Sequence, residues 1–350
     1  MLETKLRLVF WETTPDCNLK CPHCRVNNSS SPKNLLTTQE AKSFIKQISL
    51  FAKPILVFSG GEPLLRKDIY ELISFTLSLG LKPALATNAT LITKSLAQKL
   101  KASGLKVVAV SVYGATEEAH DSFCGQIGAF KKTLAGIENV KKAGLSLQIN
   151  TTITKKNLGE LEPLANFSLN QKATSYHLFF LVPTGRGRSL DGDQISPKSY
   201  ETAFNRVYEL EQNLPLRIKV TCAPHYYRIL EQRKHDEPDK PKLKQSEFHA
   251  TTKGCLAGQG VCFVSSSGEV YGCGYMPISA GNLESKSFKD IWFESDFFQS
   301  LRDESRLEGK CGFCEFKTVC GGCRARAYQA SGNYLEEEPE CSYQPSTVKL

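Results

Sequence analysis

The sequence predicts an α/β protein in which six strand–helix units form a parallel sheet or part of a barrel, followed by a small cysteine-rich domain. Short β-rich runs alternate with helical patterns from residue 6 to about residue 182. The alternation repeats at roughly thirty-residue spacing, as expected for right-handed βαβ units. From residue 255 onward the composition changes, and eight cysteines lie among Gly-rich turns. The length of 350 residues is sufficient for two domains.

The predicted elements follow one another in strict alternation. The predicted strands are 6–14, 54–60, 82–88, 106–112, 145–154 and 176–184, and the predicted helices are 37–52, 68–80, 93–104, 129–144 and 157–171. Several helical patterns end in Gly, which is common at helix C-termini because Gly adopts left-handed backbone angles readily. In parallel sheets and barrels, ligands bind at the carboxyl ends of the strands. Polar residues at those ends are therefore the first site candidates.

The pattern changes after residue 183. A Gly/Arg loop, PTGRGRSLDGD, precedes a helix predicted near 197–213, and residues 231–254 are polar enough to form a linker. We expect a core over residues 1–215, a bridging region over 216–254 and a small domain over 255–350. The small domain has too little apolar sequence for a large core, so its cysteines indicate stabilisation by metal.

Composition and charge exclude several classes of protein. Hydrophobic residues make up 41% and charged residues 23%, as in ordinary globular proteins. No apolar run is long enough for a membrane span, and the N-terminus lacks a signal-peptide pattern, so we expect a cytoplasmic protein. Thirteen cysteines in a reducing compartment favour metal binding over disulfides. The net charge of +8 is spread along the chain, which fits a solvated surface or a pocket for an anionic substrate better than a nucleic-acid interface.

Three cysteines at the spacing C-x3-C-x2-C follow the first predicted strand: Cys17, Cys21 and Cys24. A [4Fe–4S] cluster normally takes four thiolates, so three close cysteines leave one iron open. An open coordination position indicates reactivity, by the logic that separates catalytic from structural zinc sites. The alternatives are incidental thiols or a zinc site completed by His23, although zinc sites usually use CxxC pairs.

A second motif, GGEP, follows the second predicted strand. Gly60 and Gly61 allow a ligand to approach the backbone closely, Glu62 is an acceptor for an ammonium group, and Pro63 stiffens the turn. Further polar residues lie at or near later strand ends: Thr87, Asn88, Ser111, Asn150 and Thr151. Taken singly, each of these also fits an ordinary strand-end cap.

The three-cysteine motif and the downstream GGEP together resemble the signature of radical S-adenosylmethionine (SAM) enzymes. The resemblance implies that the open iron binds the amino and carboxylate groups of SAM. One electron, from a low-potential donor such as flavodoxin or ferredoxin, then cleaves SAM to methionine and a 5′-deoxyadenosyl radical. By the same resemblance, GGEP contacts the SAM amino group, and the strand-end residues contact its carboxylate, ribose or adenine.

The C-terminal cysteines resemble the SPASM extension of radical SAM enzymes. Cys255, Gly268 and Cys273 fit its opening pattern, and CGFCEFKTVCGGC is a C-x2-C-x5-C-x2-C run, although the family usually has x3 at its last spacing. The resemblance implies two auxiliary clusters and three [4Fe–4S] clusters in all. It assigns Cys255, Cys262, Cys273 and Cys323 to the first auxiliary cluster, and Cys311, Cys314, Cys320 and Cys341 to the second. Cys124 and Cys222 remain, and we expect both to be buried free thiols, with a functional role left open for Cys222.

Longer stretches, among them LVFWETTPDCNLKCPHCR, LVPTGRG and TCAPHYYRI, resemble the heme-biosynthesis branch of the family, and heme b synthases most closely. This resemblance implies oxidative decarboxylation of two propionates of iron-coproporphyrin III to vinyl groups. An anionic porphyrin needs cationic contacts. The candidate substrate residues are Arg186, Arg188, His225, Tyr226 and Arg228, and His177 or His225 is a candidate axial ligand to the porphyrin iron. Each also has an ordinary structural interpretation.

Several alternatives remain at this point. The sister enzymes that process didecarboxysiroheme or form heme d1 need a similar pocket, and SPASM enzymes also mature peptides. A non-catalytic electron carrier is a different class of protein. The open three-cysteine site with GGEP argues against a carrier, because carriers close all of their clusters.

Overall fold

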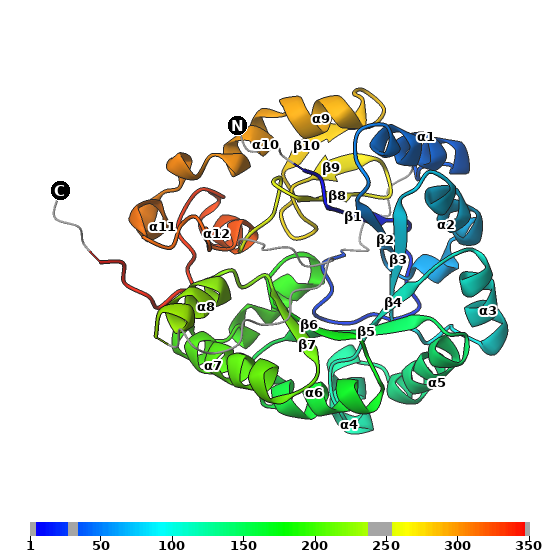
Figure 1. The fold of residues 1–350 in the computed structure, drawn as a ribbon, viewed down its shortest axis with the longest axis horizontal. Helices are drawn as coiled ribbons and strands as arrows, with labels where there is room; N and C mark the ends of the chain where they lie inside the picture. The colour runs from blue at the N-terminus through cyan, green and yellow to red at the C-terminus, as the bar shows by residue number, and fades with distance from the viewer. Residues whose placement is uncertain (1–4, 27–33, 237–253, 347–350) are drawn as a thin grey trace.

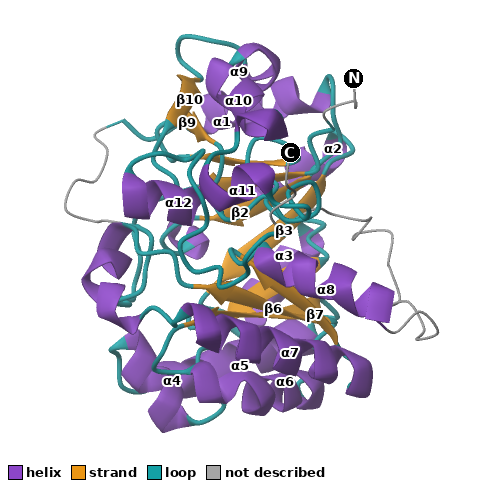
Figure 2. Cartoon of the chain, turned by 90° about the vertical axis from the view of Figure 1, so that its left-hand side faces the viewer, coloured by secondary structure: helices purple, strands orange, loops and turns teal. Residues whose placement is uncertain are grey.

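The computed structural model describes residues 5–26, 34–236 and 254–346, and these form one curved sheet with helices on its outer face (Figure 1). The sheet has ten strands in the order β10-β9-β8-β1-β2-β3-β4-β5-β6-β7. In Figure 2, β9 and β10 lie at one end of the sheet and β7 at the other. The consecutive order from β1 to β7 with all-parallel pairing is that of a partial (β/α) barrel.

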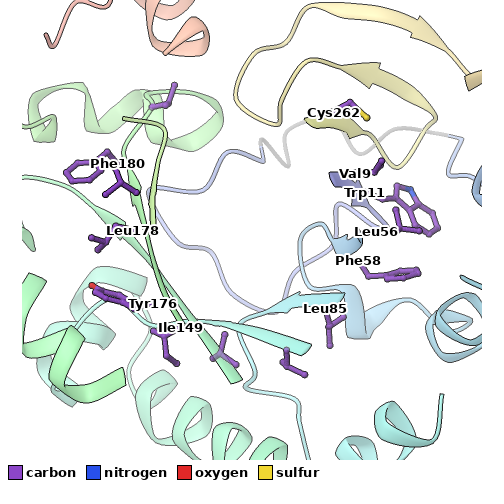
Figure 3. Close-up of a cluster of buried hydrophobic side chains, with 14 of the residues drawn as sticks. Val9, Trp11, Leu56, Phe58, Leu85, Ile149, Tyr176, Leu178, Phe180 and Cys262 are labelled. Atoms are coloured by element: carbon purple, nitrogen blue, oxygen red, sulfur yellow. The ribbon is translucent and has the colours of Figure 1, made fainter. Parts of the chain in front are cut away.

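The six predicted strands are confirmed, and a seventh extends the series. Their bounds are β1 Leu8–Glu12, β2 Ile55–Ser59, β3 Lys82–Thr87, β4 Val107–Ser111, β5 Ser146–Ile153, β6 Ser175–Phe180 and β7 Arg217–Thr221. Alternate strand residues, such as Trp11, Phe58 and Ile149, are fully buried and pack in the layer between the strands and the helices (Figure 3). This layer is the main hydrophobic core, and it leaves the concave face of the sheet to other residues.

Helices connect these strands, as the sequence predicted. Their bounds are α1 Thr38–Ser49, α2 Ile69–Ser78, α3 Lys94–Ala102, α5 Ala129–Lys142, α6 Leu161–Asn170 and α7 Pro197–Asn213. The start of α1 is fixed by a capping box. The Thr37 side chain accepts the backbone N–H of Glu40, and the Glu40 side chain accepts the backbone N–H of Thr37. Among the helices between β1 and β7, α4, Glu117–Cys124, was not predicted; it is capped by Thr116 and ends at the left-handed Gly125. Its pattern is short and contains few aliphatic residues.

The C-terminal third of the chain continues the same sheet. Strand β8, Val261–Val264, pairs in parallel with β1, and β9, Glu269–Tyr271, and β10, Ser279–Asn282, follow in antiparallel pairing. The remaining helices are α8 His225–Asp236, α9 Phe288–Glu294, α10 Asp296–Arg302, α11 Gly309–Phe313 and α12 Arg324–Ser331, with short 3₁₀ segments η1 Pro63–Leu65, η2 Leu158–Glu160, η3 Gly185–Asp193 and η4 Glu304–Arg306. The predicted linker partly forms α8, and its residues 237–253 lie outside the described parts of the chain.

Two general findings bear on the class of protein. Among the described helices, none is long and apolar enough to cross a membrane. All thirteen cysteines lie in the described ranges, and each is a free thiol there.

Candidate active site

The loop that carries the first three cysteines is bonded directly to the GGEP segment. It leaves β1 beside β2, where Thr13 N–H donates to the Ser59 carbonyl at 2.9 Å. Gly61 N–H then donates to the Thr14 carbonyl, and Glu62 N–H to the Asp16 carbonyl, both at 2.7 Å. A Cβ on Gly61 would lie 2.1 Å from the Asp16 carbonyl oxygen, so only Gly allows this approach. Two motifs distant in sequence thus form one wall of the site.

Glu62 is fully buried and holds the ends of β2 and β3 together. Its carboxylate accepts hydrogen bonds from the Thr87 hydroxyl at 2.7 Å, Asn88 N–H at 3.0 Å and Leu64 N–H at 3.2 Å. Burial raises the pKa of Glu62 to about 7, and these three hydrogen bonds oppose the rise. The Asn88 amide also donates to Asn18 at 2.9 Å and lies 3.9 Å from Cys17 Sγ. The side chain of Glu62 is therefore fixed beside the cysteine loop.

The loop after β6 supports the cysteine loop from the other side. Arg186 donates its backbone N–H to the Cys24 carbonyl at 2.9 Å and its Nε–H to the Cys21 carbonyl at 3.0 Å. Gly185 has φ of +57°, and a Cβ there would lie 2.0 Å from the Arg25 carbonyl oxygen. Arg186, a candidate for substrate carboxylates, is thus engaged with the cysteine backbone, whereas Arg188 is exposed on the same loop.

Helix α4 places a second thiol beside Cys21. Tyr113 N–H donates to Nδ1 of His120 at 3.3 Å, so the ring proton belongs on Nε2, which lies 3.4 Å from Cys124 Sγ. The Cys124 thiol in turn hydrogen-bonds to Cys21, and this bond is the main cause of a lowered pKa at Cys21. The result is a directed chain of donors that ends on one of the three candidate ligands.

His23, weighed as a zinc ligand, lies among aromatic rings. Its ring centroid is 4.4 Å from that of Tyr113 and 4.7 Å from that of Phe123. Burial lowers its pKa to about 3, so the ring is neutral.

The other strand-end candidates make local hydrogen bonds. The Thr151 hydroxyl donates to the Val112 carbonyl at 2.5 Å, and Asn150 Oδ1 accepts from Gln148 Nε2 at 2.7 Å. Gln148 Nε2 also lies 3.1 Å from Nδ1 of His177, the first candidate axial ligand. Ser111, at the end of β4, hydrogen-bonds the Tyr113 side chain. These five residues belong to β4, β5 and β6, and β5 pairs with both of the other strands.

Four of the C-terminal cysteines line a single pocket: Cys311, Cys314, Cys320 and Cys341. The same pocket is lined by His225 and Arg228, two of the candidate substrate residues. His225 is fully buried, and neither ring nitrogen has a hydrogen-bond partner among the described residues. Arg228 pairs with Glu201, and its guanidinium lies 4.9 Å from the ring centroid of Tyr343. Tyr226, the third candidate there, is buried and donates its hydroxyl to Glu211.

A buried ion pair joins the C-terminal segment to the sheet. Arg326 and Glu338 are both about 1% exposed, and Nη1 of the arginine lies 3.0 Å from one carboxylate oxygen. Glu338 also accepts the backbone N–H of Cys323 at 2.8 Å, and Arg326 Nη2 donates to the Leu181 carbonyl at 3.2 Å and the Cys222 carbonyl at 2.7 Å. The pair therefore ties α12 to the ends of β6 and β7.

The thiols fit iron–sulfur clusters in kind and arrangement. Within the described ranges, no three His, Cys, Asp or Glu side chains converge closely enough to hold a single metal ion. Thiolates on a four-iron cluster each bind a different iron, so they surround a body rather than meet at a point. Soft thiolate ligands are those that iron–sulfur clusters use. The pocket with four cysteines and an unpartnered imidazole matches this requirement.

Comparison with known proteins agrees with the fold. Residues 11–168 match the model of the Radical SAM superfamily, and residues 255–323 match an iron–sulfur cluster-binding domain, SPASM. The structure resembles that of "Native anSMEcpe with bound AdoMet", with a TM-score of 0.71 and 20% identity over 96% of this chain and 94% of that one, which shows a shared fold. The protein is therefore an enzyme of the radical SAM class, using SAM and iron–sulfur clusters.

Similarity to named proteins shows which family of radical SAM enzymes the chain belongs to. The chain is 49% identical, over 97% of its length and 97% of the relative's, to an "AdoMet-dependent heme synthase" of Methanosarcina barkeri. It is 29% identical, over 96% of its length and 88% of the relative's, to the "Fe-coproporphyrin III synthase" of the same organism. The chain belongs to the AdoMet-dependent heme synthase family of radical SAM enzymes.

Sequence reasoning missed two contributors to the site. The hydrogen bond from Cys124 to Cys21 depends on α4, which was not predicted, so no spacing rule connected the two cysteines. The role of Arg186 as a support of the cysteine loop is a contact between residues 165 positions apart. The sequence offers one signal for this contact, a glycine directly before Arg186. In the structure this residue, Gly185, has a left-handed backbone that allows the two loops to approach closely.

Proposed function

We propose that the protein converts two propionate side chains of iron-coproporphyrin III to vinyl groups and so forms heme b. The observation that carries the proposal is the 49% identity along almost the whole chain to a protein named AdoMet-dependent heme synthase, against 29% to one named Fe-coproporphyrin III synthase. The site geometry supports it, because the three-cysteine loop, Glu62 and the strand ends form one continuous wall.

Each conversion changes a propionate in a balanced way. A hydrogen atom leaves the carbon β to the carboxylate, the bond to the carboxylate carbon breaks, and CO2 and one electron depart as the vinyl double bond forms. When bound, SAM and the clusters supply the hydrogen-abstracting radical and the route for the electron. No side-chain acid or base is needed for these changes, so the chain's own task is binding, orientation and exclusion of water.

The residues of this chain have defined parts in that task. Cys17, Cys21 and Cys24 hold the SAM-binding cluster, and Glu62 accepts the SAM ammonium group, with Thr87 and Asn88 orienting its carboxylate. Gly60 and Gly61 keep the backbone close to the ligand, and Ser111, Asn150 and Thr151 contact the remaining polar groups of SAM. Arg186 orients the cysteine loop. Arg188, exposed on the adjoining loop, is the candidate for a propionate contact.

The protein holds three [4Fe–4S] clusters under this proposal, within a core over 1–215, a bridge over 216–254 and a cluster domain over 255–350. The pocket lined by Cys311, Cys314, Cys320 and Cys341 supports one auxiliary cluster, with His225 and Arg228 in its surroundings rather than at the substrate. A flavodoxin or ferredoxin in the cytoplasm is the proposed electron donor.

Anaerobic incubation with SAM, dithionite and iron-coproporphyrin III tests the proposal. We expect 5′-deoxyadenosine and a porphyrin product lighter by two formic acid equivalents, each made up of CO2 and two hydrogens. Cys21→Ala should abolish deoxyadenosine release and keep the auxiliary cluster signals. Turnover of didecarboxysiroheme alone would instead identify the sister reaction, since that substrate loses acetate side chains.

A further inference from the structure

We propose that Cys222, in place of Cys262, is the fourth thiolate ligand of the first auxiliary iron–sulfur cluster, together with Cys255, Cys273 and Cys323. This assignment rests on the proposed function, which includes that cluster. It concerns a cysteine at the end of β7 that lies outside the cysteine pattern of the small domain and outside the matched cluster-binding region, residues 255–323.

Cys262 faces the wrong side of its strand for such a role. In β8 it pairs with Val9 of β1, and its side chain lies with Val9, Trp11 and Leu56 in the apolar layer between sheet and helices (Figure 3). It is 0% exposed. Because side chains alternate along a strand, the next residue, Phe263, points to the opposite face.

The opposite face of β8 is the one that meets the active site. The guanidinium of Arg25, the residue after Cys24, lies 4.3 Å from the ring centroid of Phe263. Arg25 also pairs with Glu12 at 3.1 Å. The side chain of Cys262 is thus separated from the cysteine loop by the thickness of the sheet itself.

The polar neighbour of Cys262 belongs to the outer helices. Arg302, at the end of α10, donates to the Gly258 carbonyl at 2.7 Å and lies over the Trp292 ring at 4.7 Å. The pKa of Cys262 is raised by burial and lowered by Arg302, and none of the other cysteines contributes. Cys262 therefore has the surroundings of a small apolar core residue.

Cys222 lies next to the segments that carry two of the other three cysteines. It follows the carboxyl end of β7, and its carbonyl accepts Arg326 Nη2 at 2.7 Å, three residues along α12 from Cys323. On the other side, Gly254, which precedes Cys255, packs so closely on Pro224 that an added Cβ would lie 2.6 Å from the Pro224 Cβ. The backbone around Cys222 is therefore in contact with the segments that carry Cys323 and Cys255.

The electrostatics of Cys222 point to the same neighbours. Cys222 is half-buried, and the thiols close enough to interact with it electrostatically are Cys323, Cys273 and Cys255.

The backbone of Cys222 is also held in an uncommon conformation. Its φ is +60°, in the left-handed region, which is rare for a residue with a Cβ. Such a conformation persists where surrounding contacts impose it, and it is concentrated at functional sites. Here it turns the chain from β7 directly into α8 and leaves the Cys222 side chain beside the small domain.

Matched variants test the assignment through cluster content rather than turnover. Wild type, Cys222→Ala, Cys262→Ala and Cys255→Ala are reconstituted anaerobically, and iron, sulfide and the EPR spectrum of each are measured. We expect about twelve irons in wild type and in Cys262→Ala, and loss of up to about four irons, or a three-iron EPR signal, in Cys222→Ala and Cys255→Ala. Wild-type iron and EPR in Cys222→Ala, with loss in Cys262→Ala, would overturn the assignment.

Two further outcomes have defined meanings. If wild type holds about eight irons and Cys255→Ala holds the same, the first auxiliary cluster is absent, and both the assignment and this part of the proposed function fail. If both Ala variants at 222 and 262 lose iron, Cys222→Ser decides. A cluster with altered EPR parameters then supports ligation at 222, because oxygen has replaced sulfur, and an unchanged spectrum refutes it.

Discussion

Replacement of Gly61 by Ala tests whether the close approach between the GGEP segment and the cysteine loop is necessary for catalysis. An added Cβ would lie 2.1 Å from the Asp16 carbonyl oxygen and 2.5 Å from that of Pro15. Both atoms belong to backbone, which cannot move aside as a side-chain end can. Because ordinary contact begins near 3.4 Å, the two segments must separate by more than 1 Å.

The separation would act on the two hydrogen bonds that join the segments. Gly61 N–H to Thr14 and Glu62 N–H to Asp16 are both 2.7 Å long, and a shift of this size breaks them. Glu62 would then move relative to Cys17 and its neighbours. A misplacement of about 1 Å in a positioned site can lower a rate about 100-fold, and we expect a loss of this order in SAM cleavage.

The assay is release of 5′-deoxyadenosine by the loaded enzyme under dithionite, with iron content measured on the same sample. Gly159→Ala is the matched control, because it adds the same methyl group in η2 with no other atom within 4 Å of the new Cβ. The control should cleave SAM at the wild-type rate. Cleavage by Gly61→Ala within roughly threefold of wild type would refute the reasoning.

Three other changes have expected outcomes. Because the pKa of Glu62 is about 7, its ionised fraction falls between pH 8 and pH 6, and wild type should lose about tenfold in affinity for SAM over this range. Glu62→Gln should remove this pH dependence, and equilibrium dialysis of the loaded protein at both pH values measures the two affinities. Cys124→Ala removes a donor to Cys21 and should lower the reduction potential of the SAM-binding cluster, by about 59 mV if the equilibrium constant for one-electron reduction falls tenfold, whereas Cys124→Ser should restore most of the potential. A redox titration followed by EPR measures the potentials, and equal values in wild type and Cys124→Ala would contradict the hydrogen-bond chain. Arg326→Met leaves the buried Glu338 carboxylate without its ion-pair partner and should destabilise the fold by about 3–5 kcal/mol, with part of the loss recovered when Glu338 is also replaced by Met. Anaerobic urea unfolding measures the stability of the single and double variants, and equal midpoints for the single variant and wild type would exclude a stabilising role of the ion pair.

The six core strands were predictable because β2 and β4 are continuous apolar runs, such as ILVFS in β2, and the others are rich in apolar and β-branched residues bounded by turn residues. Strand β7 was missed because its sequence, RIKVT, alternates with charged residues. Strands β8 to β10 have three or four residues each, too few to establish a period. Their place in the sheet depends on pairing between β8 and β1, which are distant in sequence.

The same distinction between short sequence patterns and tertiary contacts applies to the candidate site. The sequence alone predicted the roles of Cys17, Cys21, Cys24 and the GGEP segment, because these residues form short motifs with characteristic spacings. The surroundings were not: Arg186 was a candidate for the substrate, and the structure engages it with the Cys21 carbonyl instead. His225 and Arg228 line the pocket of the C-terminal cysteines, a placement that needs the fold. Local patterns therefore predict candidate ligands, and tertiary contacts decide which residues support them.

The pairing of β1 with β8 has a consequence for how the protein is made. Strand β1 emerges first from the ribosome, yet one of its two edges stays unpaired until β8 is synthesised. At synthesis rates of about 5–20 residues per second this wait lasts roughly 10 to 50 s. An apolar strand with a free edge is prone to pair with other chains. Newborn chains should therefore depend on chaperones, and loss of the C-terminal third should cause aggregation before any cofactor is inserted.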